Sequence, residues 1–177
     1  MSRAVLVLAA ACLSLLRVAN GEVLGAPGMF ERLRALAGEG EGSVEWSGAR
    51  SEKGTMNGTY YVTGAGSSVV ENLTVNGTTL MTSVYHLDGG DLRMTHFCAA
   101  QNQPRLKATR FDDLKGTVEF SFLDITNLPS PGAPHVEGLT IRFVDPEQIA
   151  LTFTFVGGGA LSYEGIELRR VTSRRLG

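Results

Sequence analysis

The sequence predicts an all-β fold, an up-and-down antiparallel β-barrel of about ten strands preceded by one short helix. The chain of 177 residues contains 22 glycines. Short runs alternate apolar and polar residues, and Gly, Asn, Asp or Pro separate them. Many short strands with tight connections favour a closed barrel, because closure removes the exposed edges of an open sheet. At this length we expect one domain, and 43% hydrophobic residues are enough to build its core.

The first 21 residues have the three-part form of a secretory signal peptide. Arg3 precedes an apolar run over residues 4–16, and small residues follow as far as Gly21. This run is short for a membrane span, and no later run approaches the length of about 18 residues that a transmembrane segment needs. We therefore expect cleavage after Gly21, export to the periplasm or the cell exterior, and one domain over residues 22–177.

Charge and cysteine content narrow the class of protein further. Removal of residues 1–21 takes away two of the 16 basic residues and none of the 18 acidic ones, which leaves a formal charge of −4. An acidic chain without a basic stripe is not expected to bind nucleic acid. Only Cys98 would then remain, so an internal disulfide is excluded. Lipoprotein processing at Cys12 is an alternative, although the apolar run continues past Cys12.

A short amphipathic helix is predicted over residues 28–37, after a linker over residues 22–28. Pro27 stands where a first helical turn tolerates a missing N–H, and Gly38 is a stop signal. The apolar residues that recur at helical spacing are Met29, Phe30, Leu33, Leu36 and Ala37. We expect this face to cover one open end of the barrel. A membrane-surface helix is a weaker alternative, because the basic face is small.

The strands are predicted over residues 43–47, 55–63, 67–75, 78–87, 92–99, 105–111, 117–125, 136–144, 148–156 and 160–170. Regular alternation of apolar and polar residues indicates half-buried strands. In the last strand Tyr163, Ile166 and Leu168 are out of step around Gly165, which suggests a bulge. The proline-rich segment over residues 126–134 is either a loop that gates the barrel mouth or a plain connection, which is the commoner case.

One hairpin holds most of the unusual chemistry of the chain. Gly89-Gly90 between two alternating runs is typical of a tight turn, because glycine accepts positive φ. We therefore pair Asp88 with Asp91. In this register the more apolar face, which we expect to face the interior, carries Met81, Ser83, Tyr85, Leu87, Leu92, Met94, His96 and Cys98. A slip of one residue would exchange the two faces.

This inner face predicts a binding cavity, since ligand pockets are mostly apolar with a few convergent polar groups. The exit loop adds amides and a guanidinium, which suit a polar or anionic ligand group at the rim. The predicted ligand-binding residues are Tyr85, His96, Cys98, Ser83, Met94, Asn102, Gln103 and Arg105. The alternative is that His96 and Cys98 are ordinary core residues and that the amides satisfy the turn.

Metal and thiol chemistry are weaker predictions. His96 and Cys98 give two ligands where zinc needs three or four, and His86 points to the other face, so we expect no metal and no cofactor. A thiol-dependent enzyme that uses Cys98 and His96 is an alternative function. No third group is evident to orient the pair, and the motifs of serine hydrolases, phosphate loops and dinucleotide sites are missing, so we predict no catalytic residue.

The same hairpin carries a family resemblance. Residues 85–92 and 95–105 read YHLDGGDL and THFCAAQNQPR, and FERL at 30–33 and LAGEGEG at 36–42 precede them. These segments resemble the signature YHLDGxxL…THxCAAxNQPR of a family of uncharacterised, often exported bacterial lipocalin-like β-barrel proteins. The resemblance covers most of the mature chain. It implies a lipocalin-like barrel and attaches no activity to it.

Two other barrel families compare less well. The segment over residues 38–42 resembles the Gly-x-Trp opening of lipocalins loosely, but Gly40 stands at the Trp position and Trp46 is the only Trp. Nitrobindin-like barrels hold haem through a late histidine, whereas the last histidine here is His135. We therefore predict a barrel that binds a small molecule in its interior. Besides the thiol-dependent enzyme, the alternative is a packed barrel that acts as a protein-interaction module.

Overall fold

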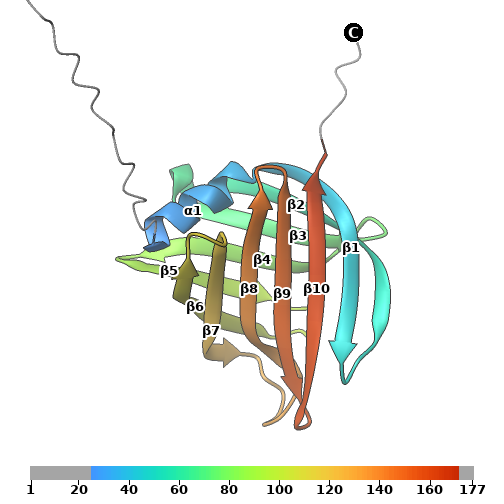
Figure 1. Cartoon of the computed structure of the whole chain (residues 1–177). Helices are drawn as coiled ribbons and strands as arrows, with labels where there is room; N and C mark the ends of the chain where they lie inside the picture. Colours follow the sequence, from blue (N-terminus) through green and yellow to red (C-terminus); the bar gives the residue numbers. More distant parts are fainter. Residues whose placement is uncertain (1–24, 172–177) are drawn as a thin grey trace, which may run out of the picture.

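In the computed structural model, which describes residues 25–171, ten antiparallel strands close into a barrel and one helix lies across an end of it (Figure 1). Each strand pairs with its neighbours in sequence, and the last strand pairs with the first. The elements are α1 (Gly25–Ala35), β1 (Gly38–Gly48), β2 (Glu52–Thr63), β3 (Ser68–Val75), β4 (Thr78–Asp88), β5 (Asp91–Phe97), β6 (Gln103–Asp112), β7 (Thr117–Thr126), β8 (His135–Asp145), β9 (Gln148–Gly157) and β10 (Ala160–Arg170). The predicted fold class is confirmed. The predicted signal peptide and Cys12 lie outside the described residues.

The glycine-rich start of β1 is the main difference from the predicted strand boundaries. The strand begins at Gly38, whereas the prediction began it at residue 43. Only glycine fits at position 42, because a Cβ there would collide with the carbonyl oxygen of Glu167 on β10. Glycine thus lets β1 and β10 approach each other and complete the barrel.

Helix α1 covers one end of the barrel, as predicted (Figure 1). It begins at Gly25, so the predicted linker is helical from that residue, and it ends at Ala35. Met29 and Leu33 are fully buried in the core. The guanidinium of Arg170, at the end of β10, donates hydrogen bonds to the carbonyl oxygens of Ala35 and Ala37, at 2.6 and 2.9 Å. These bonds satisfy carbonyls that the helix end leaves free and tie the helix to the barrel.

The predicted register of the central hairpin is confirmed. Asp88 pairs with Asp91, and Ser83 lies opposite His96. Gly89 takes the positive φ of 59° that the turn requires. The face of the hairpin that carries Ser83 and His96 points inward, and both side chains are at most 1% exposed.

The bulge predicted at Gly165 is wrong. Residues 160–169 pair without a register shift with β9, and residues 162–170 pair in the same way with β1. Tyr163 points outward and is 38% exposed, whereas Glu164 points inward and is 3% exposed. Ile166 and Leu168 point inward, and side chains two residues apart on a strand share a face. Glu164 therefore points inward with them.

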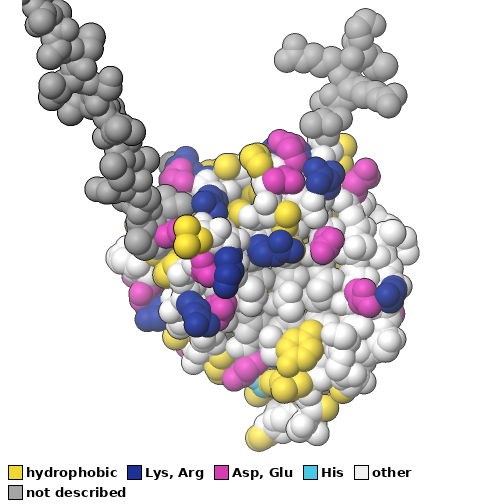
Figure 2. All heavy atoms as spheres, in the orientation of Figure 1, with side chains coloured by type: hydrophobic (Ala, Val, Ile, Leu, Met, Phe, Trp, Pro, Cys, Tyr) yellow, Lys and Arg dark blue, Asp and Glu magenta, His cyan; other side chains and the backbone are white. Residues whose placement is uncertain are grey.

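The two ends of the barrel differ. At the helix end the interior is packed. The other end, called the open end below, is formed by the loops over residues 49–51, 76–77, 98–102, 127–134 and 158–159. Charged side chains of both signs gather toward the helix end, and the outer face over β8 to β10 is mostly uncharged (Figure 2). No helix within residues 25–171 combines the length and the apolar character needed to cross a membrane.

Candidate functional site

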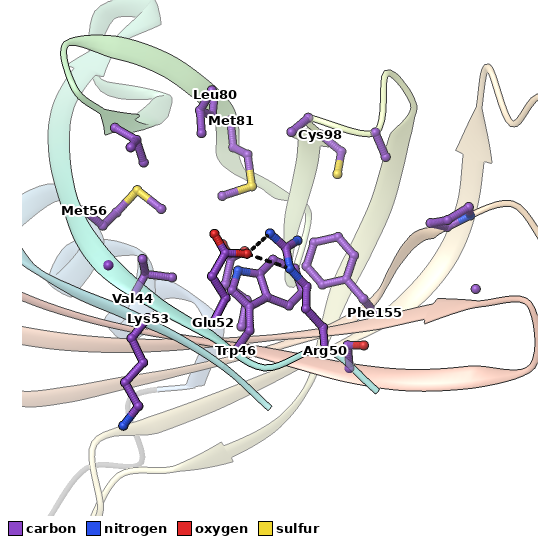
Figure 3. A pocket seen from close by; sticks show the side chains of 18 of the residues that line it. Val44, Trp46, Arg50, Glu52, Lys53, Met56, Leu80, Met81, Cys98 and Phe155 are labelled. Atoms are coloured by element: carbon purple, nitrogen blue, oxygen red, sulfur yellow. Dashed lines mark hydrogen bonds and ion pairs between the residues drawn. The ribbon is translucent and has the colours of Figure 1, made fainter. Parts of the chain in front are cut away.

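A cavity of about 730 Å³ occupies the open end of the barrel (Figure 3). One of its walls is aromatic, with the ring centroids of Trp46 and Phe155 4.9 Å apart. Other apolar lining residues are Val44, Met56, Leu80, Met81 and Cys98. This volume and lining match those of small-molecule sites, which commonly measure about 300–1,000 Å³.

The charged groups at the cavity mouth are paired with one another. The guanidinium of Arg50 lies over the Trp46 ring, with its Cζ 3.9 Å from the ring centroid. It also donates to the Glu52 carboxylate, with Nη2 2.5 Å from Oε2 (Figure 3). The ammonium of Lys53 lies 2.9 Å from Glu45 Oε1. These two cations are therefore already engaged by carboxylates of the chain.

Within residues 25–171, Glu164 is the one residue of the cavity lining that carries a carboxyl group and is buried. It projects from β10, between Trp46 on β1 and Phe153 on β9. Its Oε2 is buried and has no hydrogen-bond partner within residues 25–171. Burial raises the pKa of Glu164 to about 7, although Arg50 acts to lower it. A buried carboxyl without a partner is costly to the fold, so an acceptor held in this way suits a donor that comes from outside the chain.

Cys98 also lines the cavity, and its surroundings favour the protonated thiol. Burial raises the pKa of Cys98, and the charge of Glu164 adds to this effect. A thiolate nucleophile needs the opposite, a lowered pKa and a base in contact. The base predicted to activate the thiol, His96, has its Nδ1 3.0 Å from Ser83 Oγ. The geometry gives no support to the thiol-dependent enzyme.

Four predicted ligand-binding residues, Ser83, Tyr85, Met94 and His96, lie in the packed interior and are absent from the cavity lining. Burial lowers the pKa of His96 to about 4, so the ring is neutral at physiological pH. Its centroid lies 4.9 Å from that of Phe153. Within residues 25–171, no group of three or more His, Cys, Asp or Glu side chains is placed to hold a metal ion.

A second buried acid, Glu71, organises this packed region. The hydroxyl of Tyr60 donates to Glu71 Oε2 at 2.8 Å, and that of Tyr85 lies 3.3 Å from both carboxylate oxygens. Burial raises the pKa of Glu71, whereas hydrogen bonds from Tyr60, Ser83 and Tyr85 lower it. The carboxyl is therefore satisfied by the protein itself.

The predicted polar rim holds the loops of the open end together. Asn102 Nδ2 donates to the carbonyl oxygen of Pro134 at 2.9 Å, which ties the exit loop to the proline-rich loop. Gln103 Oε1 accepts hydrogen bonds from Thr126 and Asn127. Arg105 forms a two-pronged ion pair with Asp124 on the outer face. Of the eight predicted residues, only Cys98 lines the cavity, and ligand binding by the set stays a prediction.

The sequence reasoning missed the residues that give the cavity its chemistry, namely Trp46, Arg50 and Glu164. A signal for Glu164 was present, because it is in step with Ile166 and Leu168 on the inward face. Trp46 has a similar signal, as it follows Val44 with the period of a strand. Arg50 lies in a loop, where strand periodicity gives no information.

No protein-family model and no curated protein matches this chain. Among solved structures, it is similar to a protein of unknown function from the DUF3598 family of Nostoc punctiforme, with a TM-score of 0.54 and 13% identity over 78% of this chain and 49% of that one. It is also similar to Rv2717c from M. tuberculosis, with a TM-score of 0.52 and 12% identity over 81% of this chain and 98% of that one. This chain spans about half the length of the Nostoc protein. What they share is the barrel fold. At such low identities the likeness extends no further.

Proposed function

We propose that this protein is an exported barrel that binds a small, mostly apolar molecule in the cavity at its open end. The observation that carries the proposal is a hollow of about 730 Å³ with a buried carboxyl group in its wall, one oxygen of which has no hydrogen-bond partner within residues 25–171. The rest of the interior is packed, and the hollow is confined to the end that the helix does not cover. Export follows from the signal-peptide pattern of residues 1–21, and the family resemblance of the hairpin agrees with it.

The barrel supports binding by keeping the walls of the cavity fixed. Trp46, Met81 and Phe155 come from three strands that the closed ladder of hydrogen bonds holds in place. A preformed cavity binds a ligand without the entropy cost of ordering loops. The tie between Asn102 and Pro134 restrains two of the loops at the mouth in the same way.

A neutral apolar dye, N-phenyl-1-naphthylamine, tests this function directly. We expect its fluorescence to rise on binding with a stoichiometry of one, and we expect the emission of Trp46 to change in parallel. The Gly54→Phe variant should weaken binding at least about tenfold, because a side chain there enters the cavity and its Cβ meets only Val44 Cγ1, at 3.6 Å.

Thr59→Phe is the matched control, since it places the same side chain on the exposed outer face of the same strand, β2. Both variants are first compared with the wild type by urea denaturation, so that a loss of fold is distinguished from a loss of cavity. Equal dye affinity in Gly54→Phe and wild type, or no dye binding to the wild type, would contradict the proposal.

A further inference from the structure

The wall that carries Glu164 combines a carboxyl with two aromatic rings. Trp46 is the cross-strand neighbour of Glu164, and Phe155 packs against Trp46. All three side chains line the cavity, and Glu164 is 3% exposed. A carboxylate beside aromatic rings is an arrangement by which proteins recognise organic cations.

We infer that the ligand is a hydrophobic amine whose protonated nitrogen pairs with the Glu164 carboxylate and whose apolar body fills the cavity. This inference rests on the proposed function and specifies its ligand class. Glu164 lines the cavity and its Oε2 has no hydrogen-bond partner within residues 25–171, so the ammonium brings the carboxylate a donor that the described chain does not supply to Oε2. The opposite charge makes that bond stronger than one to a neutral donor.

The chain itself shows that this aromatic wall accepts a cation. The guanidinium of Arg50 lies over the Trp46 ring at 3.9 Å, at the mouth of the same cavity. Arg50 is held there by Glu52 and does not satisfy Glu164 Oε2. A ligand cation deeper in the cavity meets the carboxyl of Glu164, whose negative charge attracts it.

The remaining charges of the lining disfavour an anionic ligand. Arg50 and Lys53, the cations of the lining, are each paired with a glutamate, Glu52 and Glu45 respectively. An anion inside the cavity would face Glu164, a like charge that costs free energy in a medium of low dielectric constant. The apolar end of the amine packs against Met56, Leu80 and Met81, on the wall formed by β2 and β4.

The test uses three probes with one chain length and different head groups: decylamine, decanol and decanoate. Binding at pH 8 is followed by the emission of Trp46, the only Trp of the chain, at concentrations below micelle formation. We expect wild type to bind decylamine at least about tenfold more tightly than decanol, the ratio that one charge-assisted hydrogen bond supplies. Decanoate should bind most weakly.

Glu164→Gln should reduce the preference for decylamine over decanol to about twofold or less while decanol affinity is kept. Glu167→Gln, which removes the same charge from the exposed face of the same strand, should keep the full preference. Glu164→Asp, which retains the charge on a shorter side chain, should restore part of it. Urea denaturation of each variant confirms that the fold is intact.

The outcomes separate the two proposals. Equal or tighter binding of decanol or decanoate by wild type overturns the amine inference and leaves the proposed function standing. A preference for decylamine that persists in Glu164→Gln overturns the role of Glu164. Failure of all three probes and of the naphthylamine dye overturns the proposed function together with the inference.

Discussion

Two buried glutamates, Glu71 and Glu164, face the interior of this barrel in opposite surroundings. Glu71 is fully buried and accepts hydrogen bonds from two tyrosine hydroxyls. Glu164 is buried to nearly the same extent, but its Oε2 has no partner within residues 25–171. The contrast teaches that burial alone does not distinguish a structural acid from a binding acid. The distinction lies in whether the chain supplies the donors.

The same contrast extends to packing. Around Glu71, the interior is filled by side chains such as Tyr85, Leu73 and Met94, each at most 1% exposed. Around Glu164, the interior opens into the cavity. A filled region contributes stability, and a hollow one gives up contacts that a ligand can restore. Four predictions test this difference between the two regions.

The largest effect is expected from Glu71→Leu. The substitution leaves the hydroxyls of Tyr60 and Tyr85 buried without their acceptor, at about 1–3 kcal/mol each. We expect the free energy of unfolding to fall by about 4 kcal/mol in urea denaturation. Tyr60→Phe, which removes one hydrogen bond and leaves no orphaned donor, should cost about 1 kcal/mol. A loss below 1 kcal/mol in Glu71→Leu would show that the cluster is not structural.

Leu33→Ala in α1 probes the packed end next. Leu33 is completely buried against the barrel, and truncation of such a side chain costs about 3 kcal/mol. Leu80→Ala at the cavity rim is the comparison, because Leu80 is 44% exposed and its loss should cost less than about 0.5 kcal/mol. Equal losses in the two variants would contradict the division into a packed and a hollow end.

Glu164→Gln is expected to stabilise the unliganded protein, by about 3 kcal/mol at pH 8. The pKa of Glu164 is about 7 in the folded state and near its ordinary value of 4.5 in the unfolded state. Between these values the folded state holds the proton more tightly, so wild type loses stability as pH rises. The advantage of the variant should therefore be absent near pH 4, grow toward pH 7 and level off above it. A variant that is less stable than wild type at pH 8 would mean that Glu164 has a partner in the folded protein.

The smallest effect concerns Cys98, whose thiol faces the cavity. Because burial and Glu164 raise its pKa, iodoacetamide should modify Cys98 more slowly than free cysteine at pH 7.5. Glu164→Gln should increase the rate about two- to threefold by removing the negative charge. Mass spectrometry of the intact protein follows both reactions. If iodoacetamide modified Cys98 of the wild type faster than free cysteine, the result would support the thiol-dependent enzyme.

The fold was predictable because its determinants are local. Gly89-Gly90 fixes the turn, so the pairing of Ser83 with His96 followed from counting. The alternation in β7 and β9 fixed which residues face inward. The start of β1 at Gly38 was not predictable in this way, because it depends on how closely β10 approaches Gly42.

The site was predicted less well, since it depends on contacts between distant strands. The prediction of which hairpin side chains face the interior was correct. Whether the space beside them is packed or hollow depends on the side-chain volumes that the other eight strands of the described barrel contribute. The prediction grouped Tyr163 with Ile166 and Leu168 and explained their mismatch by a bulge at Gly165, although the phase of Ile166 and Leu168 puts Glu164 on the inward face. A rule that trusts the period of a strand over the polarity of one residue would have found Glu164.

NMR of the side-chain carboxyl carbons distinguishes a Glu164 that a ligand must satisfy from one that the folded chain already satisfies. The Cδ shifts of Glu71 and Glu164 are followed against pH, with and without saturating decylamine. In the free protein Glu164 should titrate near pH 7, and decylamine should shift its titration toward the ordinary range of a carboxyl group, while Glu71 is unaffected. An ordinary Glu164 titration in the free protein that decylamine does not change would contradict the account.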